Sequence, residues 1–120
     1  METFRIILQI IVALGLLNVW ILRAGKATSF RGRGAANMRE EFKAYGLPPS
    51  FMLLVGALKI GVAVAFLAGI WFPALVRPAA VVLIVLMLGA IGMHVKVRDP
   101  LRRALPSLAM LVLATAIALL

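Results

Sequence analysis

The sequence contains no cysteine, a single histidine and four acidic residues among its 120. Without cysteine the chain cannot form a disulfide framework, a CxxC redox pair or a thiolate metal site. One histidine does not suffice for a bis-histidine haem or a histidine-rich metal site within one chain. We therefore expect no intrinsic cofactor and no metal, so any redox-active group that the protein serves would belong to another molecule.

Apolar residues and positive charge are what the chain has in excess. Hydrophobic residues make up 64% of it, and its mean hydropathy is +1.10. Soluble domains are nearer half apolar, so this composition predicts a membrane environment. Thirteen lysines and arginines against four acidic residues give a net charge of +9. Because these cations are grouped between apolar runs, we expect them to meet anionic lipid headgroups and not nucleic acid.

Four apolar segments are long enough to cross a bilayer, whose hydrocarbon core of about 30 Å takes roughly 20 helical residues. They cover about residues 6–22, 51–72, 78–95 and 104–120. A short turn around Pro73 makes the second and third an antiparallel pair. Arg23 follows the first segment where a signal peptide would have a small-residue cleavage site, so we interpret that segment as a retained helix. The predicted fold class is all-α, with residues 1–120 forming one integral membrane four-helix bundle.

Lysine and arginine are divided unevenly between the two sides of this predicted bundle. Six lie between the first and second segments and four between the third and fourth, whereas only Arg5 and Arg77 lie on the opposite side. The positive-inside rule places such basic loops in the cytoplasm. We therefore expect a multi-pass protein of the bacterial inner (cytoplasmic) membrane with both termini in the periplasm.

A short amphipathic helix is predicted between the first two membrane segments, over about residues 37–45. Asn37 can cap this helix, Glu40 completes a capping box, and Gly46 followed by two prolines ends it. Two turns of helix are marginally stable alone, so we expect it to lie at the membrane interface or on the cytoplasmic mouth of the bundle. The apolar face of this interfacial helix consists of Met38, Phe42 and Tyr45.

Three of the few polar residues within the membrane segments share the predicted cytoplasmic half: Asn18, Lys59 and His94. Lys59 is eight residues beyond Phe51, which places it about 12 Å deeper along the helix. A charge inside the membrane costs at least about 2.5–3.5 kcal/mol on insertion scales, so it usually faces a cavity or a partner. We therefore interpret Lys59, His94 and Asn18 as candidate ligand-binding residues.

Simpler interpretations of these residues stay open. Lys59 could extend its stem toward the headgroups or pair with a backbone carbonyl. His94 could be an interfacial hydrogen-bonding residue, although an imidazole at a membrane surface can also donate a proton. Glu40 and Glu41 are candidate acidic partners, and besides Asp99 they are the carboxylates able to reach Lys59 or His94.

The second membrane segment carries small residues at four-residue spacing: Gly61, Ala65 and Gly69. Small residues at this spacing allow helices in membranes to approach one another closely. We therefore expect a neighbouring helix to pack along this ladder.

Four stretches of the chain resemble the DoxX-like family of small four-helix bacterial membrane proteins. They are LRAGKATSFRG, EEFKAYGLP, VGALKIGVAVAFLAGIW and MLGAIGMHVKVRDPLRRALPS, the last being the most distinctive. The resemblance covers nearly the whole chain and implies a four-helix bundle. It also implies a link to respiratory or oxidative-stress chemistry, since relatives include a subunit of a thiosulfate:quinone oxidoreductase. His94 matches the histidine of the family, whereas Lys59 stands near the place where many relatives carry a glutamate, so a proton-carrying role of that carboxylate does not transfer.

Two functions fit these observations, and neither requires an enzyme acting alone, since the sequence has no catalytic motif. The first is an accessory subunit of a membrane redox system, in which Lys59, His94 and Asn18 line a pocket for a quinone headgroup or a bound lipid. The second is a non-catalytic assembly or scaffolding subunit that binds a protein partner, or a second copy of itself, through the segment 37–45. Transport of a small anion would require several chains, because one four-helix bundle offers little room for a pathway.

Overall fold

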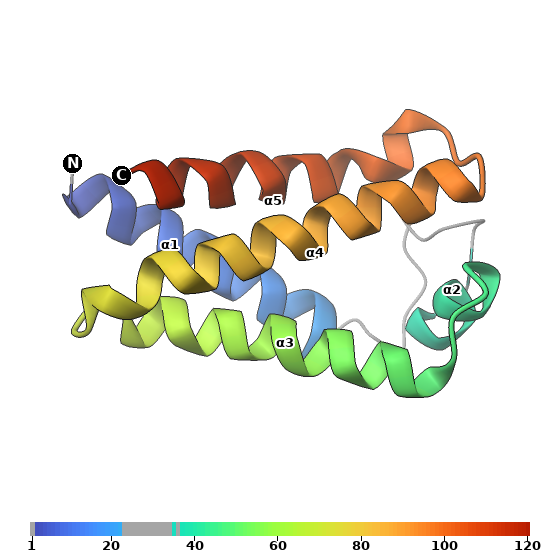
Figure 1. Cartoon of the computed structure of the whole chain (residues 1–120), viewed down its shortest axis with the longest axis horizontal. Coiled ribbons are helices and arrows are strands. Elements are labelled where there is room, and N and C mark those ends of the chain that lie inside the picture. Colours follow the sequence, from blue (N-terminus) through green and yellow to red (C-terminus); the bar gives the residue numbers. More distant parts are fainter. Residues whose placement is uncertain (1, 23–34, 36) are drawn as a thin grey trace.

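Four long helices of alternating direction make up most of this computed structural model, which describes residues 2–22, 35 and 37–120 (Figure 1). They are α1 (Glu2–Leu17), α3 (Pro49–Ala68), α4 (Val76–Lys96) and α5 (Leu101–Leu119). Each of the four is long and apolar enough to cross a membrane, α1 together with the helical residues that continue it to Ile21. The predicted fold class, an all-α integral membrane four-helix bundle, is confirmed.

Three short helical elements connect or extend the long ones. A π-helix, η1 (Asn18–Leu22), continues α1; α2 (Met38–Ala44) precedes α3; and a 3-10 helix, η3 (Pro73–Leu75), forms the turn between α3 and α4. Helices α4 and α5 begin two and three residues before the expected starts. Pro78 lies in the first turn of α4, where backbone N–H groups have no intrahelical acceptor. A proline, which lacks an N–H group, is therefore compatible with the earlier start of the helix.

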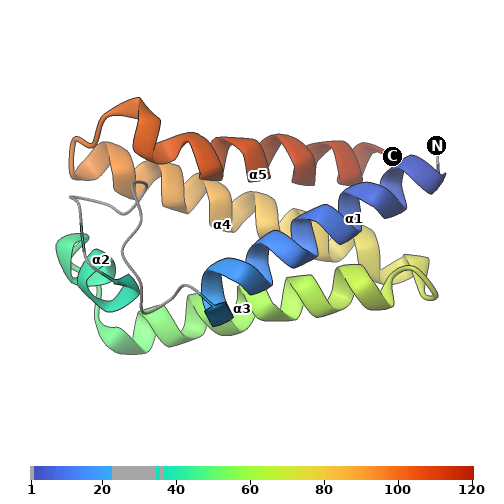
Figure 2. The ribbon, with the colours of Figure 1, turned by 180° about the vertical axis from the view of Figure 1, so that it is seen from behind.

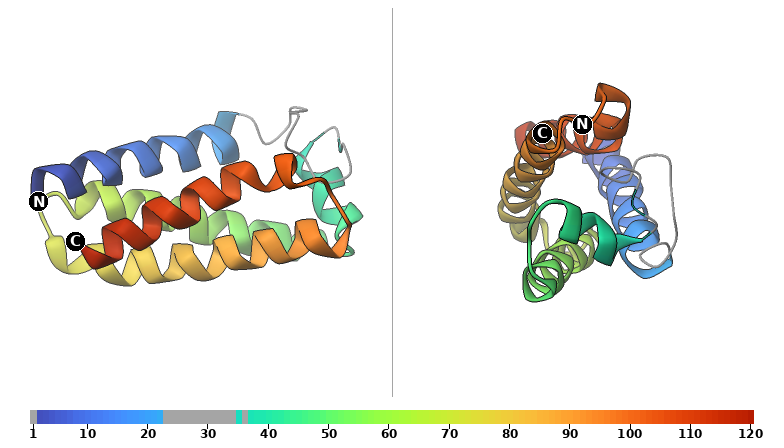
Figure 3. Two further views of the ribbon diagram at one scale, coloured as in Figure 1. Left: turned by 90° about the horizontal axis from the view of Figure 1, so that it is seen from above. Right: turned by 90° about the vertical axis from the view of Figure 1, so that its right-hand side faces the viewer.

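The helices follow one another around the bundle in chain order, so that each packs against two neighbours: α1 with α3 and α5, and α4 with α3 and α5 (Figure 3). The most extensive packing joins α4 to α5. Both termini lie beside the α3–α4 turn, at what we call the termini end (Figure 1). Helix α2 and the α4–α5 connection lie at the opposite, loop end, as the view from behind also shows (Figure 2).

Apolar side chains fill the centre of the bundle and also cover its outside. Fully buried residues from the four long helices include Val12, Ala63, Phe66, Leu83 and Ala114. Their outward-facing counterparts include Leu14, Val64, Val85 and Val112, each more than half exposed. A helix that is apolar all round is typical of a membrane span, so lipid is the environment that this outer surface fits.

Other parts of the chain approach α3 closely at Gly56 and Gly69, and not at Gly61. Gly56 is not part of the predicted ladder of small residues. A Cβ on Gly61 would have nothing within 4 Å, whereas a Cβ on Gly56 would lie 2.8 Å from the Trp20 ring. At Gly69 it would lie 2.6 Å from Val76. The ladder is therefore wrong at Gly61 and holds at Gly69. Eight residues of α-helix turn the direction of the side chain by about 80°, so the ends of such a ladder face different neighbours.

Helix α2 lies across the mouth of the bundle at the loop end. Its N-terminus is capped by the Asn37 side chain, which accepts a hydrogen bond of 2.9 Å from the Glu40 amide. It ends in a Schellman motif, in which Gly46, at φ +78°, donates to Lys43 and Leu47 donates to Phe42. Phe42 and Tyr45 are buried, so this apolar face of α2 packs on the bundle. The Met38 side chain, and the loop cations from Arg23 to Arg33, lie outside the described residues.

Candidate functional site

Aromatic and charged side chains from five parts of the chain meet at the loop end and connect Lys59 with His94. We call them the loop-end cluster: Trp20, Phe42, Tyr45, Phe51, Lys59, His94, Asp99 and Arg103. They come from η1, α2, α3, the end of α4 and the start of α5 with the turn before it. The cluster is therefore assembled by the tertiary fold from segments far apart in sequence.

Lys59 has an aromatic partner. Its Nζ lies 5.2 Å from the centroid of the Trp20 ring, a cation–π distance. The Trp20 ring reaches this place because Gly56, one turn earlier on α3, has no side chain to block it. Trp20 itself lies on the π-helix η1, a type of turn that is frequent at functional sites. The charge of Lys59 is thus stabilised by a partner that the sequence analysis did not anticipate.

A row of rings continues from Trp20 toward His94. The ring centroids of Trp20 and Phe42 are 6.1 Å apart, and those of Phe42 and Tyr45 are also 6.1 Å apart. Tyr45 meets the His94 ring at 6.0 Å and 75°, while Phe51 flanks Phe42 at 6.5 Å. These are edge-to-face and tilted arrangements, which the quadrupoles of aromatic rings favour.

His94 is held by a carboxylate on the turn that follows α4. Its Nδ1 lies 2.8 Å from Oδ2 of Asp99, and Oδ1 of Asp99 accepts a hydrogen bond of 2.9 Å from Nη1 of Arg103. The Asp99 side chain is 2% exposed, so its charge is stabilised by these bonds and not by water. Arg98 adopts φ 57°, and the Asp99 amide donates to the His94 carbonyl at 3.0 Å, which folds Asp99 back beneath the histidine.

Further hydrogen bonds fasten α2 over the cluster. Nζ of Lys96 donates to the Tyr45 carbonyl at 2.8 Å and so joins α4 to the end of α2. The Tyr45 hydroxyl donates to Oε1 of Glu41 at 2.7 Å. Because both bonds involve Tyr45, the ring that covers His94 is fixed at its backbone and at its hydroxyl.

The structure brings two of the three candidate ligand-binding residues into one cluster. Lys59 and His94 are joined through the row of rings, whereas Asn18, on η1, makes no side-chain hydrogen bond to another described residue. Among the described carboxylates, the one that His94 contacts is Asp99, while Glu41 contacts Tyr45 and the Glu40 side chain is exposed. Within the described ranges, no group of three or more histidine, cysteine, aspartate or glutamate side chains is placed to hold a metal ion.

Sequence reasoning missed Trp20 and Arg103 as members of this site. A tryptophan at the end of a membrane span is typical of an interfacial anchor, and that pattern could have drawn attention to Trp20. Asp99 and Arg103 are four residues apart at the start of α5, a spacing at which opposite charges meet. Neither pattern identifies the partner on another helix.

Comparison with models of protein families gives a match over most of the chain. A model of the DoxX-like family matches residues 8–117, a range that contains the whole loop-end cluster. Neither the curated proteins nor the solved structures contain a match to the chain.

Proposed function

Since the chain belongs to the DoxX-like family and spans the membrane several times, we propose that it is an accessory subunit of a quinone-linked membrane redox system. In this proposal the protein binds the headgroup of a quinone at the loop-end cluster, and a partner protein carries out the electron transfer. The loop end faces the cytoplasm, as the distribution of lysine and arginine predicts. The isoprenoid tail extends along the apolar outer surface of the bundle.

The observation that carries this proposal is the row of aromatic rings that begins at the Lys59 ammonium and ends at the His94 ring. A quinone headgroup is a flat ring with two opposed carbonyl oxygens. Aromatic side chains offer faces and edges to such a ring, and the ammonium of Lys59 can donate to one carbonyl. His94 lies at the far end of the row, where Asp99 engages its Nδ1, so Nε2 is the ring nitrogen left for a second contact of the ligand or of the partner protein.

The position of α2 favours a ligand over a protein partner as the occupant of this site. Tyr45 and His94 are buried beneath α2, so a ring enters the cluster when α2 moves away from α4. The bond from Lys96 to the Tyr45 carbonyl is one contact that this movement breaks. The scaffolding alternative would use the apolar face of α2, but the two residues of that face whose side chains are described, Phe42 and Tyr45, are buried within the chain. Among the α2 residues whose side chains are described, those on the exposed face are charged, such as Arg39 and Lys43.

The test uses Trp20 as a reporter inside the cluster. The chain has two tryptophans, and Trp71 is 74% exposed at the termini end, so the Trp71→Phe variant leaves Trp20 as the single emitter. The purified variant in detergent micelles is titrated with a short-chain ubiquinone analogue while tryptophan fluorescence is recorded. We expect saturable quenching, because a bound quinone would lie against the Trp20 ring. Adding Lys59→Met, which keeps the apolar stem, should weaken binding about tenfold, the effect of losing one charged hydrogen bond.

Lys43→Met is the matched control, since it removes an exposed lysine from the same end of the molecule. It should leave the quenching curve unchanged. Quenching that never saturates, and is equal in Lys59→Met and Lys43→Met, would overturn the proposal. A second measurement is organic extraction of the protein purified from its own membrane. A co-purifying protein without any extracted quinone would favour the assembly function instead.

A further inference from the structure

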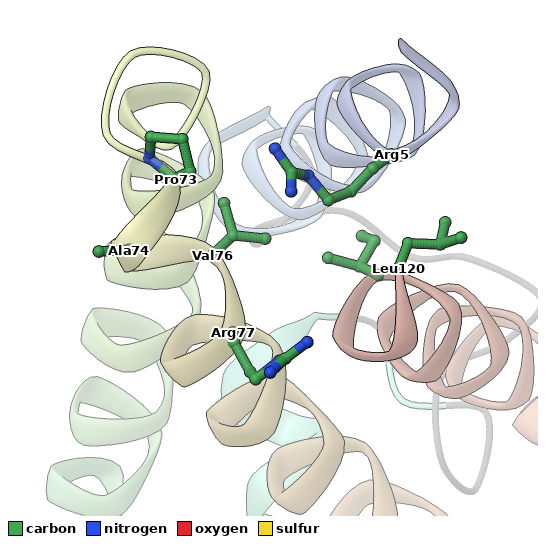
Figure 4. Close-up of a pocket in the computed structure, with 7 residues that line it drawn as sticks. Arg5, Pro73, Ala74, Val76, Arg77 and Leu120 are labelled. Atoms are coloured by element: carbon green, nitrogen blue, oxygen red, sulfur yellow. The ribbon is translucent and has the colours of Figure 1, made fainter. Parts of the chain in front are cut away.

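A second polar feature lies at the termini end, at the opposite end of the bundle from the loop-end cluster. A cavity of about 230 Å³ opens between α1, η3, the start of α4 and the end of α5. Its walls are largely apolar, made of Pro73, Ala74, Val76, Ile117 and Leu120. Arg5 and Arg77 are its charged lining residues, and Figure 4 shows their guanidinium groups on two sides of the space between Val76 and Leu120.

Hydrogen bonds through Nε hold both guanidinium groups in place. Nε of Arg5 donates to Oε1 of Gln9 at 3.1 Å, and Gln9, which is fully buried, donates in turn to the Phe66 carbonyl at 2.8 Å. Nε of Arg77 donates to the Ala118 carbonyl at 3.1 Å. Each arginine is thus fixed by its inner nitrogen, and within the described part of the chain no hydrogen bond engages the terminal nitrogens of either group.

The positive charge of this pocket is poorly balanced by the described residues. None of the seven lining residues has an acidic side chain, and Leu120 brings a carboxylate to the rim only through its backbone, where this sequence ends. Glu2 approaches Nη2 of Arg5 to 3.9 Å, and its side chain is 74% exposed. An exposed ion pair at that distance contributes little. Two preoriented arginines therefore converge on a small cavity whose lining side chains include no carboxylate.

We propose that this pocket binds a single phosphate group, carried by the headgroup of an anionic phospholipid or by free phosphate. Guanidinium groups present paired donors that match phosphate oxygens, and charge-assisted bonds of this kind are among the strong ones. The cavity is smaller than the roughly 300–1,000 Å³ of sites for whole small molecules, which fits a headgroup better than a complete ligand. The start of α4 at Val76 adds the positive end of a helix dipole. This inference is independent of the quinone proposal, since it concerns the other end of the bundle.

The test is native mass spectrometry of the detergent-solubilised protein. The protein carries a C-terminal tag, so that Leu120 has a neutral peptide bond at the rim of the pocket and not a free carboxylate. Phosphatidylglycerol is titrated in one arm and inorganic phosphate in the other. We expect one saturable adduct, weakened about tenfold by Arg77→Gln and again by Arg5→Gln, as expected for the loss of a charged hydrogen bond from each. Arg102→Gln, the same change at an exposed arginine of the loop end, should leave the adduct unchanged.

The arms separate the two sources of phosphate. An adduct of phosphatidylglycerol alone assigns the site to lipid, and an adduct of inorganic phosphate alone assigns it to the free anion. Ala74→Trp fills the mouth of the pocket without changing the charge of the pocket, so this variant should also weaken the adduct. Because Ala74 is exposed, the substitution should not disturb folding. Adducts of equal strength in wild type, Arg5→Gln/Arg77→Gln and Arg102→Gln would overturn the proposal.

Discussion

Replacing Asp99 with asparagine tests whether the buried carboxylate holds the loop end together. The side chain keeps its shape but loses its charge, so the bonds to His94 and Arg103 become neutral or are lost. Hydrogen bonds to charged groups contribute about 1.5–3 kcal/mol each, and removing one partner of a buried pair costs about 3–5 kcal/mol. Arg103 is 24% exposed and can regain some hydration, so the cost should lie at or below the lower end of the range for a buried pair. We expect Asp99→Asn to lower the free energy of unfolding by about 2–3 kcal/mol.

The assay is reversible unfolding in mixed micelles, driven by increasing sodium dodecyl sulfate and followed by far-ultraviolet circular dichroism. Glu2→Gln is the matched control, because it removes a carboxylate that is 74% exposed and 3.9 Å from Arg5. That change should shift the free energy of unfolding by less than about 1 kcal/mol, as is typical of surface ion pairs.

A double-mutant cycle of Asp99→Asn with Arg103→Gln isolates the pair itself. We expect a coupling energy of about 1 kcal/mol or more, within the range for residues in direct contact. Equal stability of Asp99→Asn and Glu2→Gln, together with a coupling energy near zero, would refute the reasoning. It would mean that the carboxylate does not hold the end of α4 to the start of α5.

Two further predictions concern glycines and use the same unfolding assay. Gly56→Ala should lower the free energy of unfolding by about 1–3 kcal/mol, because the added methyl group overpacks against the Trp20 ring. Gly61→Ala should leave the free energy of unfolding unchanged or raise it, because open space surrounds Gly61. Equal effects at the two sites would contradict this packing. Gly46→Ala should lower the free energy of unfolding by about 1–2 kcal/mol, because Gly46 adopts φ +78°. Gly46→Asn should lower it by less, since asparagine tolerates this conformation. The reverse order would exclude backbone strain as the cause.

The architecture was largely predictable from the sequence. Apolar runs of the length that crosses a bilayer predict four spans, and the turn at Pro73 predicts the antiparallel pair α3 and α4. The ends of α2 were also accessible, because Asn37 and Gly46 act within one or two turns of chain. Local features of this kind depend on neighbours in sequence and need no knowledge of the packing.

The candidate sites were predictable only in part. Lys59 and His94 attract attention because a polar group in an apolar segment is costly, whatever it contacts. Their partners Trp20 and Asp99, and the joining of Lys59 to His94 through Phe42 and Tyr45, follow from how the helices are rotated against one another.

The number and length of the apolar segments are properties of the chain alone, and they suffice to identify an all-α membrane bundle. Which side chains meet depends on how the helices pack. Helices such as α3 and α4 are apolar all round, so hydropathy does not specify the face that each turns inward, and steric fit at positions such as Gly56 and Gly69 does. For the same reason, no sequence pattern predicts the pocket that Arg5 and Arg77 share, since they lie on different helices and far apart in sequence.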